Sequence, residues 1–285
     1  MRSKATVLLA VAVMTIAWAV SGVADAAELR IAIMQAQAGE ARAYQPLLDY
    51  LRKNGIPASF TTAPNYTAAA EMFSKGQADA MFSGSGIAGT MIIKEVASPL
   101  VRPVTEAGTS TYSAVVVAKK GSPKFTGGAD YFTGKKVIFT ALASSGEFYY
   151  RSLGAPRAKE MMLAASHGAA IDALSRGQAD IAIVKNHVWT KEMSKYPDLE
   201  KVGGDSGENP DNTLIVSKKL AQADVRKLSS VLLGLKTDDA PEAAEVKKSL
   251  KIREYIRTTE ADFASTLALL RKAGVTKAFD FKFQK

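Results

Sequence analysis

A turn at residues 140–146 holds the side chains best suited to binding a small oxyanion. It carries Ser144, Ser145 and Gly146, follows an apolar strand expected over 136–139, and opens a helix. Serine hydroxyls and the free backbone N–H groups at a helix start can converge on a negatively charged group. The same residue types can also serve only as a helix cap. The turn by itself is therefore compatible with an anion-binding site and with a helix cap that binds no ligand.

Two further helix starts carry a phenol and an imidazole ring, on Tyr66 and His167. Two polar runs, 83–86 (Ser-Gly-Ser-Gly) and 184–187 (Val-Lys-Asn-His), follow strands that read as buried. Ligands of open α/β sheets lie beyond the carboxyl ends of the strands, where helix amino termini point their free N–H groups. We therefore expect both runs and both helix starts to line one cleft. An ordinary polar core position is the alternative for His167.

The same residues can be drawn as a Ser-His-Asp catalytic set, with a serine of the 140–146 turn, His167 and Asp180. Asp180, however, precedes a buried strand at a glycine turn, and Asp79 has the same place elsewhere with no histidine near it. A shared position indicates a structural role in the turn, so we expect no enzyme activity and no catalytic residue. The two histidines, His167 and His187, lack carboxylates at ligand spacing, so we expect no metal site and no cofactor.

An internal repeat organises these positions. Residues 66–82 match residues 167–183 at a constant offset of 101, with Gly-Gln-Ala-Asp identical in both copies. Each copy reads as one helix, a glycine stop and a buried strand. Two copies this far apart indicate two similar lobes rather than a solenoid of short repeats. Chance similarity between alanine-rich helices is the alternative.

Strand and helix patterns alternate along the chain. A strand at 29–34 is followed by an amphipathic helix at 43–53 and a second strand near 58–61. Strand, helix and strand with short links predict an α/β fold with largely parallel sheets and helices on both faces.

The repeat and the alternation together predict where the lobes divide. We expect residues 27–112 and 217–285 to form lobe 1 and residues 113–216 to form lobe 2. Strands at 113–118 and 212–216 should cross between the lobes as a hinge. The helices that follow should return to lobe 1.

The first residues read as a secretory signal peptide. Two positive residues precede an apolar run over 5–20, and Ala-Asp-Ala at 24–26 supplies a small-residue cleavage pattern. We therefore expect a signal peptide at 1–26, cleavage near Ala26, and a soluble mature protein in the periplasm; an uncleaved anchor is the alternative. The sequence contains no cysteine, which excludes disulfides, thiolate metal sites and a lipoprotein anchor.

Positive charge exceeds negative charge, with a formal net charge of +9. Such an excess suits nucleic acid, a membrane surface or an anionic solute. The lysines and arginines are spread along the chain, without long basic runs or interleaved aromatic residues, so we expect no nucleic-acid partner. The positive charge could serve to attract anions, or it could simply keep the surface soluble; the sequence leaves both interpretations open.

Several segments, taken in order, resemble the periplasmic binding proteins of phosphonate, phosphate and phosphite ABC transporters, within the type II binding-protein and transferrin-like superfamily. The resemblance extends to about Leu220 and rests on residues 29–32, 47–51, 66, 76–84, 112–117, 132–137, 166–170 and 177–180. It implies a two-lobed α/β fold of the type II periplasmic-binding-protein class with two hinge-crossing strands. It also implies a protein, expected to be a monomer, that captures a small anionic solute for an ABC permease in the inner membrane. Presentation of the ligand to a membrane sensor, such as a histidine kinase or chemoreceptor, and binding of a different solute are the alternatives.

The resemblance also implies a ligand site formed by Tyr66, the serine turn and His167. The family usually has Ser-Thr-Ser-Gly in that turn, whereas this chain begins it with Ala143, so one hydroxyl is absent. Relatives that hold an amino-phosphonate have carboxylates near the positions of Asn186 and Asn212, so the amides here favour a phosphate-like oxyanion over a zwitterion. The predicted ligand-binding residues are Tyr66, Ser83, Ser85, Tyr112, Ser144, Ser145, Gly146, His167, Asn186 and Asn212.

Overall fold

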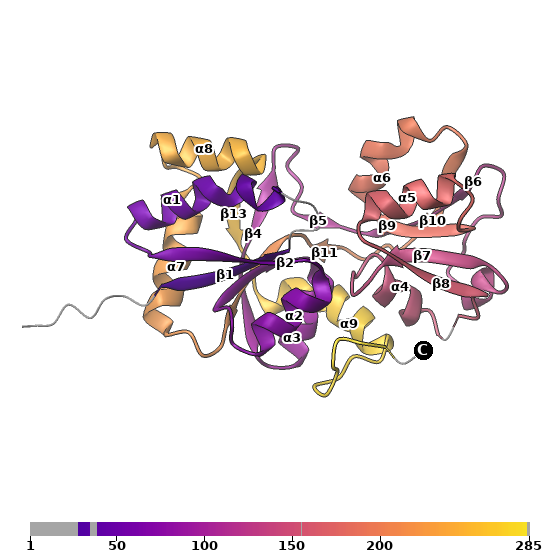
Figure 1. The fold of residues 1–285 in the computed structure, drawn as a ribbon, viewed down its shortest axis with the longest axis horizontal. Helices are drawn as coiled ribbons and strands as arrows, with labels where there is room; N and C mark the ends of the chain where they lie inside the picture. The colour runs from indigo at the N-terminus through magenta and orange to yellow at the C-terminus, as the bar shows by residue number, and fades with distance from the viewer. Residues whose placement is uncertain (1–27, 35–38, 155, 284–285) are drawn as a thin grey trace, which may run out of the picture.

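The computed structural model describes residues 28–34, 39–154 and 156–283. The expected signal peptide at 1–26 lies outside these residues. No helix in the described part of the chain is long and apolar enough to cross a membrane. Two lobes, each built on its own β-sheet, lie side by side and are joined by extended segments (Figure 1).

The first lobe is built on a six-stranded sheet in the order β13-β4-β12-β3-β1-β2. Strand β1 runs parallel to β2 and β3, whereas β12 is antiparallel to both of its neighbours and β13 is antiparallel to β4. The strands are β1 (Leu29–Met34), β2 (Ala58–Ala63), β3 (Ala80–Ser83), β4 (Ala97–Thr105), β12 (Thr213–Ser217) and β13 (Ile252–Arg257). The helices are η1 (Glu40–Tyr44), α1 (Gln45–Lys53), α2 (Tyr66–Ser74), α3 (Ser85–Ile93), α7 (Gln222–Gly234) and α8 (Pro241–Leu250).

Alternate residues of these strands enter different cores. In β3, Phe82 joins the cluster that includes Leu47 of α1 and Leu232 of α7, whereas Met81 joins the cluster that includes Phe73 of α2 and Met91 of α3. Successive side chains of a strand point to opposite faces, so a sheet covered on both faces needs apolar residues throughout. This is why the central strand β3 is apolar up to its last residue and buried throughout.

The second lobe is built on a five-stranded sheet in the order β10-β6-β9-β7-β8. Strand β7 runs parallel to β8 and β9, whereas β6 is antiparallel to β9 and to β10. The strands are β6 (Ala114–Lys119), β7 (Lys136–Thr140), β8 (Glu160–Ala164), β9 (Ile181–Lys185) and β10 (Leu199–Gly204). The helices are η2 (Ala129–Phe132), α4 (Glu147–Ser152), α5 (His167–Ser175), α6 (Asn186–Glu192) and η3 (Met193–Lys195).

The internal repeat appears as equivalent strand neighbours in the two sheets. The run β12-β3-β1-β2 corresponds to β6-β9-β7-β8, with the first pair antiparallel and the rest parallel in both. Helices α2 and α5 begin at equivalent caps, because Asn65 accepts a hydrogen bond from Ala68 N and Ser166 accepts one from Ala169 N. The similarity therefore reflects the same strand arrangement and not only alanine-rich composition.

The aspartates of the repeated Gly-Gln-Ala-Asp have the same structural role in both lobes. Asp79 accepts a hydrogen bond from the backbone N–H of Arg30 in β1 (3.0 Å), and Asp180 accepts one from Lys136 in β7 (2.8 Å). The preceding glycines, Gly76 and Gly177, have φ values of 72° and 73°, the left-handed conformation that ends a helix. Each aspartate thus ties the turn after the helix to the neighbouring strand.

The crossing between the lobes differs from the expected one. A short antiparallel pair, β5 (Thr111–Tyr112) and β11 (Asn209–Pro210), lies between the two sheets (Figure 1). The expected hinge strand at 113–118 is β6 of the second sheet, and the expected strand at 212–216 is β12, which pairs with β3 and β4 of the first sheet. Residues 213–216, expected in lobe 2, therefore lie in the first sheet, because the chain completes its crossing before β12 begins.

The last helix, α9 (Ala264–Lys272), contacts both lobes. It follows η4 (Glu260–Phe263) and packs against α3 of the first lobe and α4 of the second. Thr266 of α9 donates a hydrogen bond to the side chain of Asn209 in β11 (2.7 Å). Helices α7 and α8 return to the first lobe as expected, whereas α9 contacts both lobes and the crossing pair.

The lobes are in close contact at Gly86, the second residue of α3. A Cβ atom on Gly86 would lie 2.9 Å from the ring of Phe148 in the second lobe, and closer still to the carbonyl oxygen of Leu142. Contacts this short can be relieved only if the backbone of the turn or the lobes themselves shift. Glycine at this position is therefore a condition for the observed packing between the lobes.

Gly86→Ala should separate the lobes and lower the free energy of unfolding by about 1 to 3 kcal/mol, because it adds a methyl group to a filled contact. Gly84→Ala is the matched control, since its Cβ would only reach ordinary contact distance, 3.8 Å from the hydroxyl of Tyr66. Chemical denaturation and small-angle scattering measure the two effects. Equal stability and equal radius of gyration for the two variants would contradict this account of Gly86.

Candidate functional site

A cavity of about 300 Å³ lies where the strand ends of the first lobe meet the hinge and β9. A wider cavity, of about 620 Å³, shares Met34 and Tyr66 with it and reaches Thr140 and Leu163 of the second lobe. Both lobes therefore contribute to one cleft. The smaller cavity is lined by Ile33, Met34, Tyr44, Tyr66, Phe82, Ser83, Gly84, Lys185, Asp211 and Asn212.

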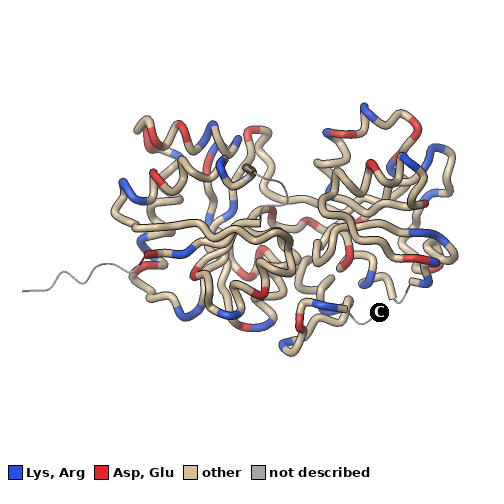
Figure 2. Tube along the Cα trace, in the orientation of Figure 1, with Lys and Arg blue, Asp and Glu red and all other residues tan. Residues whose placement is uncertain are grey.

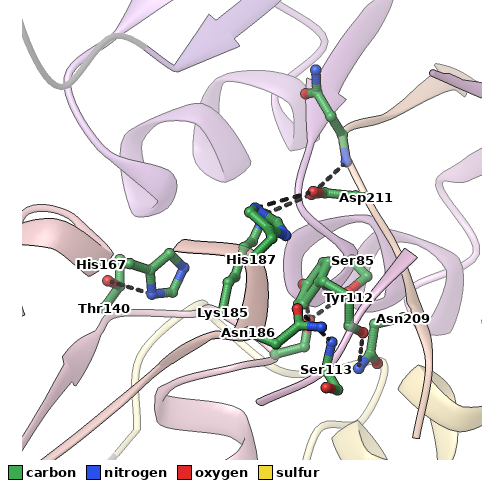
Figure 3. Close-up of polar contacts among 12 residues, drawn as sticks. Ser85, Tyr112, Ser113, Thr140, His167, Lys185, Asn186, His187, Asn209 and Asp211 are labelled. Carbon is green, nitrogen blue, oxygen red and sulfur yellow. Dashed lines mark hydrogen bonds and ion pairs between the residues drawn. The ribbon is translucent and has the colours of Figure 1, made fainter. Parts of the chain in front are cut away.

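His167 begins α5 and is buried, with its side chain beside the end of β7. Its Nδ1 atom lies 3.4 Å from the hydroxyl oxygen of Thr140 (Figure 3). Burial lowers the pKa of His167 to about 3, and the positive charge of Lys185 acts in the same direction. The imidazole is therefore neutral at physiological pH, with one ring nitrogen able to donate a hydrogen bond and the other able to accept one.

Four buried polar atoms in this region have no hydrogen-bond partner among the described residues. They are Ser83 Oγ and Thr213 Oγ1 in the first lobe, and Ser145 Oγ and His167 Nε2 in the second. Ser83 and Thr213 are direct neighbours across β3 and β12. Buried polar groups in proteins are nearly always hydrogen-bonded. Each of these four atoms therefore keeps hydrogen-bonding capacity that no described side chain or backbone group uses.

Three hydroxyl groups bond one another at the junction of the lobes. Ser85 Oγ lies 2.6 Å from the hydroxyl oxygen of Tyr112 and 2.6 Å from Ser144 Oγ, and the last two are 2.8 Å apart. Ser85 begins α3, Tyr112 belongs to the hinge strand β5, and Ser144 belongs to the turn before α4. This closed ring of hydroxyls joins both lobes to the hinge, and each member already has two partners.

A mostly buried ion pair that the sequence did not reveal lies at the hinge side of the cavity. Lys185 Nζ is 2.6 Å from Asp211 Oδ1, and the two side chains are only 12% and 21% exposed (Figure 3). Asp211 Oδ1 also accepts the backbone N–H of Asn212 (2.9 Å), and Oδ2 lies 3.7 Å from His187 Nε2.

The two partners hold each other in their charged forms. Burial alone lowers the pKa of Lys185, but the negative charge of Asp211 outweighs it, and the pKa of Lys185 is raised. Burial likewise raises the pKa of Asp211, but Lys185 and then His187 outweigh it, and that pKa is lowered. Removing one partner would leave the other as an uncompensated buried charge.

Tyr44, at the end of η1, also lines the cavity and was missed in the sequence. Its hydroxyl accepts a hydrogen bond from Asn212 Nδ2 (2.9 Å). Asn212 has a φ of 42°, a left-handed conformation that asparagine tolerates better than most residues. The family resemblance pointed to Asn212, but Tyr44 lies outside the repeated segments 66–82 and 167–183, so nothing in the sequence pointed to it.

The structure brings most of the predicted ligand residues together at the junction of the lobes, where they fall into groups with different surroundings. Tyr66, Ser83 and Asn212 line the cavity, and Ser145 and His167 carry unpartnered buried atoms. Ser85, Tyr112 and Ser144 form the hydroxyl ring.

Two predicted residues are fixed by backbone contacts. Asn186 does not line the smaller cavity, and its Oδ1 accepts the backbone N–H of Ser113 (3.2 Å), which anchors the start of β6. Gly146 precedes α4, and a Cβ there would lie 2.8 Å from the carbonyl oxygen of Thr140. Its lack of a side chain allows the serine turn to fold against β7.

The Ser-His-Asp arrangement is not formed. Asp180 lies at the start of β9 and is bonded to Lys136, whereas His167 lies beyond the opposite ends of the parallel strands. Among the described residues, no group of three or more His, Cys, Asp or Glu side chains could hold a metal ion.

His167→Gln should remove an acid-dependent loss of stability. The pKa of His167 is about 3 in the folded protein and ordinarily 6.5, so below pH 6.5 the unfolded chain binds a proton that the folded protein does not. The wild type should therefore lose stability as the pH falls from 6.5 towards 3, by about 2 kcal/mol at about pH 5. Chemical denaturation at about pH 8 and pH 5 measures the difference between wild type and variant.

His187→Gln serves as the control, because its side chain is 47% exposed and should contribute less to this pH dependence. If His167→Gln lost as much stability on acidification as the wild type, a neutral buried His167 would be contradicted.

Comparison with known proteins agrees with this architecture. The family model described as "ABC transporter, phosphonate, periplasmic substrate-binding protein" matches residues 31–263. No curated protein matches the chain in sequence.

Several solved structures share the fold at low sequence identity. XAC2383 from Xanthomonas citri bound to ATP has a TM-score of 0.72 at 17% identity, over 87% of this chain and 98% of that one. PhnD1 from Prochlorococcus marinus in complex with methylphosphonate has a TM-score of 0.69 at 16% identity, over 87% and 98%. A binding protein component of an ABC phosphonate transporter (PA3383) from Pseudomonas aeruginosa has a TM-score of 0.66 at 14% identity, over 87% and 86%.

These likenesses confirm the predicted two-lobed periplasmic-binding-protein fold. The family match covers most of the chain and agrees with the resemblance inferred from the sequence. The chain therefore belongs to the periplasmic substrate-binding proteins of phosphonate ABC transporters.

Proposed function

We propose that this protein captures a small oxyanion of the phosphate, phosphite or phosphonate type in the cleft between its lobes and delivers it to an ABC permease. Membership of the family supports the solute-binding role. The similar PhnD1 was solved with methylphosphonate, which supports this ligand class for the present chain.

The observation that carries the proposal is the set of unpartnered buried atoms at the cleft. Hydroxyls of Ser83, Thr213 and Ser145 can donate to an anion, and neutral His167 can donate from Nε2 when Nδ1 accepts from Thr140. A tetrahedral oxyanion presents several acceptor oxygens in different directions. One such ion could therefore partner donors from both lobes and hold the cleft closed.

The anion is attracted by groups at the site and not by one basic face of the molecule. Lys and Arg are interspersed with Asp and Glu over both lobes (Figure 2). At the cleft, Asn65 and Ser166 cap the starts of α2 and α5, where helix dipoles favour negative charge. The strength of attraction should therefore depend on local donors more than on the net charge.

The proposed role also bears on catalysis, export and oligomeric state. Family members are the substrate-binding component of a transporter, and we propose no catalytic activity for this chain. We also propose export through the signal peptide at 1–26, action as a monomer in the periplasm, and no nucleic-acid partner. A sensor role is not favoured by the comparisons.

Ser145→Ala should weaken oxyanion binding roughly 5- to 150-fold, because it removes a hydrogen bond to a charged group worth about 1 to 3 kcal/mol. Ser229→Ala is the matched control, since Ser229 Oγ is also buried without a partner but lies in α7, away from the cleft. Calorimetry on protein freed of bound solute by unfolding and refolding, against phosphate, phosphite, methylphosphonate and sulfate, measures the affinities. Failure of the wild type to bind any of them would refute the oxyanion proposal.

A further inference from the structure

The two lobes contribute unequal charge to the cleft. Lys185 ends β9, and the repeat offset of 101 pairs it with Gly84, which follows β3. Gly84 has no side chain, and a Cβ there would lie 3.8 Å from the hydroxyl of Tyr66. The second lobe therefore extends an ammonium group into the cleft at the position where the first lobe leaves space.

The ammonium group retains donor capacity after its ion pair is made. Lysine has three N–H donors, and among the described residues Lys185 Nζ has one hydrogen bond, to Asp211 Oδ1. The centre of the Tyr112 ring lies 4.2 Å from Nζ. Since Lys185 lines the cavity, its remaining donors are available to a bound anion.

The carboxylate is occupied by the protein itself. Asp211 Oδ1 accepts from both Lys185 and the backbone of Asn212, and Oδ2 lies beside His187. A positive group on a ligand would have to displace Lys185 from this carboxylate and would stand close to a like charge. Like charges in a partly buried site repel strongly because the effective dielectric is low.

We propose that Lys185 makes this site selective for oxyanions that carry no amine, by neutralising Asp211 and repelling a ligand ammonium group. The inference rests on the proposed oxyanion binding and names its ligand class. It assigns the discrimination to one side chain, so removing that side chain should convert Asp211 into an unoccupied acceptor for an amine.

Methylphosphonate and 2-aminoethylphosphonate form a suitable pair of probes, because both carry a phosphonate and only the second carries an ammonium group. Wild-type protein, stripped of solute, should bind methylphosphonate at least about tenfold more tightly. Lys185→Met should lose or reverse this preference, because the ammonium of the ligand can then pair with Asp211. Calorimetry gives both affinities, and circular dichroism confirms that the variant is folded.

Two further variants complete the test. Lys191→Met removes an exposed lysine of α6 and should leave the preference unchanged. The double variant Lys185→Met/Asp211→Asn has neither charge, remains testable if Lys185→Met fails to fold, and should bind the two probes within about threefold of each other.

The possible results separate this inference from the function on which it rests. If the wild type bound no phosphonate, phosphate or phosphite, the proposed function would fail and the inference with it. If it bound methylphosphonate but did not prefer it, or if the double variant kept the wild-type preference, the role of Lys185 would be overturned while oxyanion binding stood.

Discussion

The carboxyl ends of the parallel strands in both sheets meet at one junction. The buried polar groups there need hydrogen-bond partners from the other lobe, the hinge or a ligand. Ser83 ends β3, Lys185 ends β9, and Thr140 ends β7 beside His167. Some of these polar groups find hydrogen-bond partners in the other lobe or in the hinge, as Ser85, Tyr112 and Ser144 do in their hydroxyl ring. Others are left to whatever enters the cleft. Buried donors without partners are unfavourable, so a ligand that satisfies them stabilises the assembled site.

At the junction, Lys185 offers N–H donors to the cavity while it neutralises the carboxylate of Asp211. The Lys185–Asp211 pair has no net charge, and the imidazole of His167 is neutral because it is buried next to that lysine. In the proposed function, attraction for an anion comes from oriented hydroxyl, ammonium and helix-start N–H groups, which bind without the desolvation of additional unpaired charges. The packing of Gly86 against the second lobe and the contact of α9 with both lobes hold these groups in place.

Much of the two-lobed fold could be predicted from the sequence, because it depends on an internal repeat and on alternating strand and helix patterns. The repeat of Gly-Gln-Ala-Asp predicted two similar lobes, and its aspartates have identical backbone contacts around Asp79 and Asp180. The crossing was placed a few residues late, because strand propensity does not reveal which sheet a strand will join. Site prediction named Asn186 and Asn212, each one residue after the ionic groups that line the cavity, Lys185 and Asp211. A charged pair formed between distant segments leaves no local signal, and neither does the approach of Tyr44 to Asn212.

The most direct test of the account is a crystal structure of the protein with methylphosphonate bound. The account predicts phosphonate oxygens within hydrogen-bond distance of Ser145 Oγ and His167 Nε2 from the second lobe, and of Ser83 Oγ or Thr213 Oγ1 from the first. A ligand bound to one lobe alone, or a phosphonate group directed away from these atoms, would contradict the claim that one oxyanion satisfies both lobes.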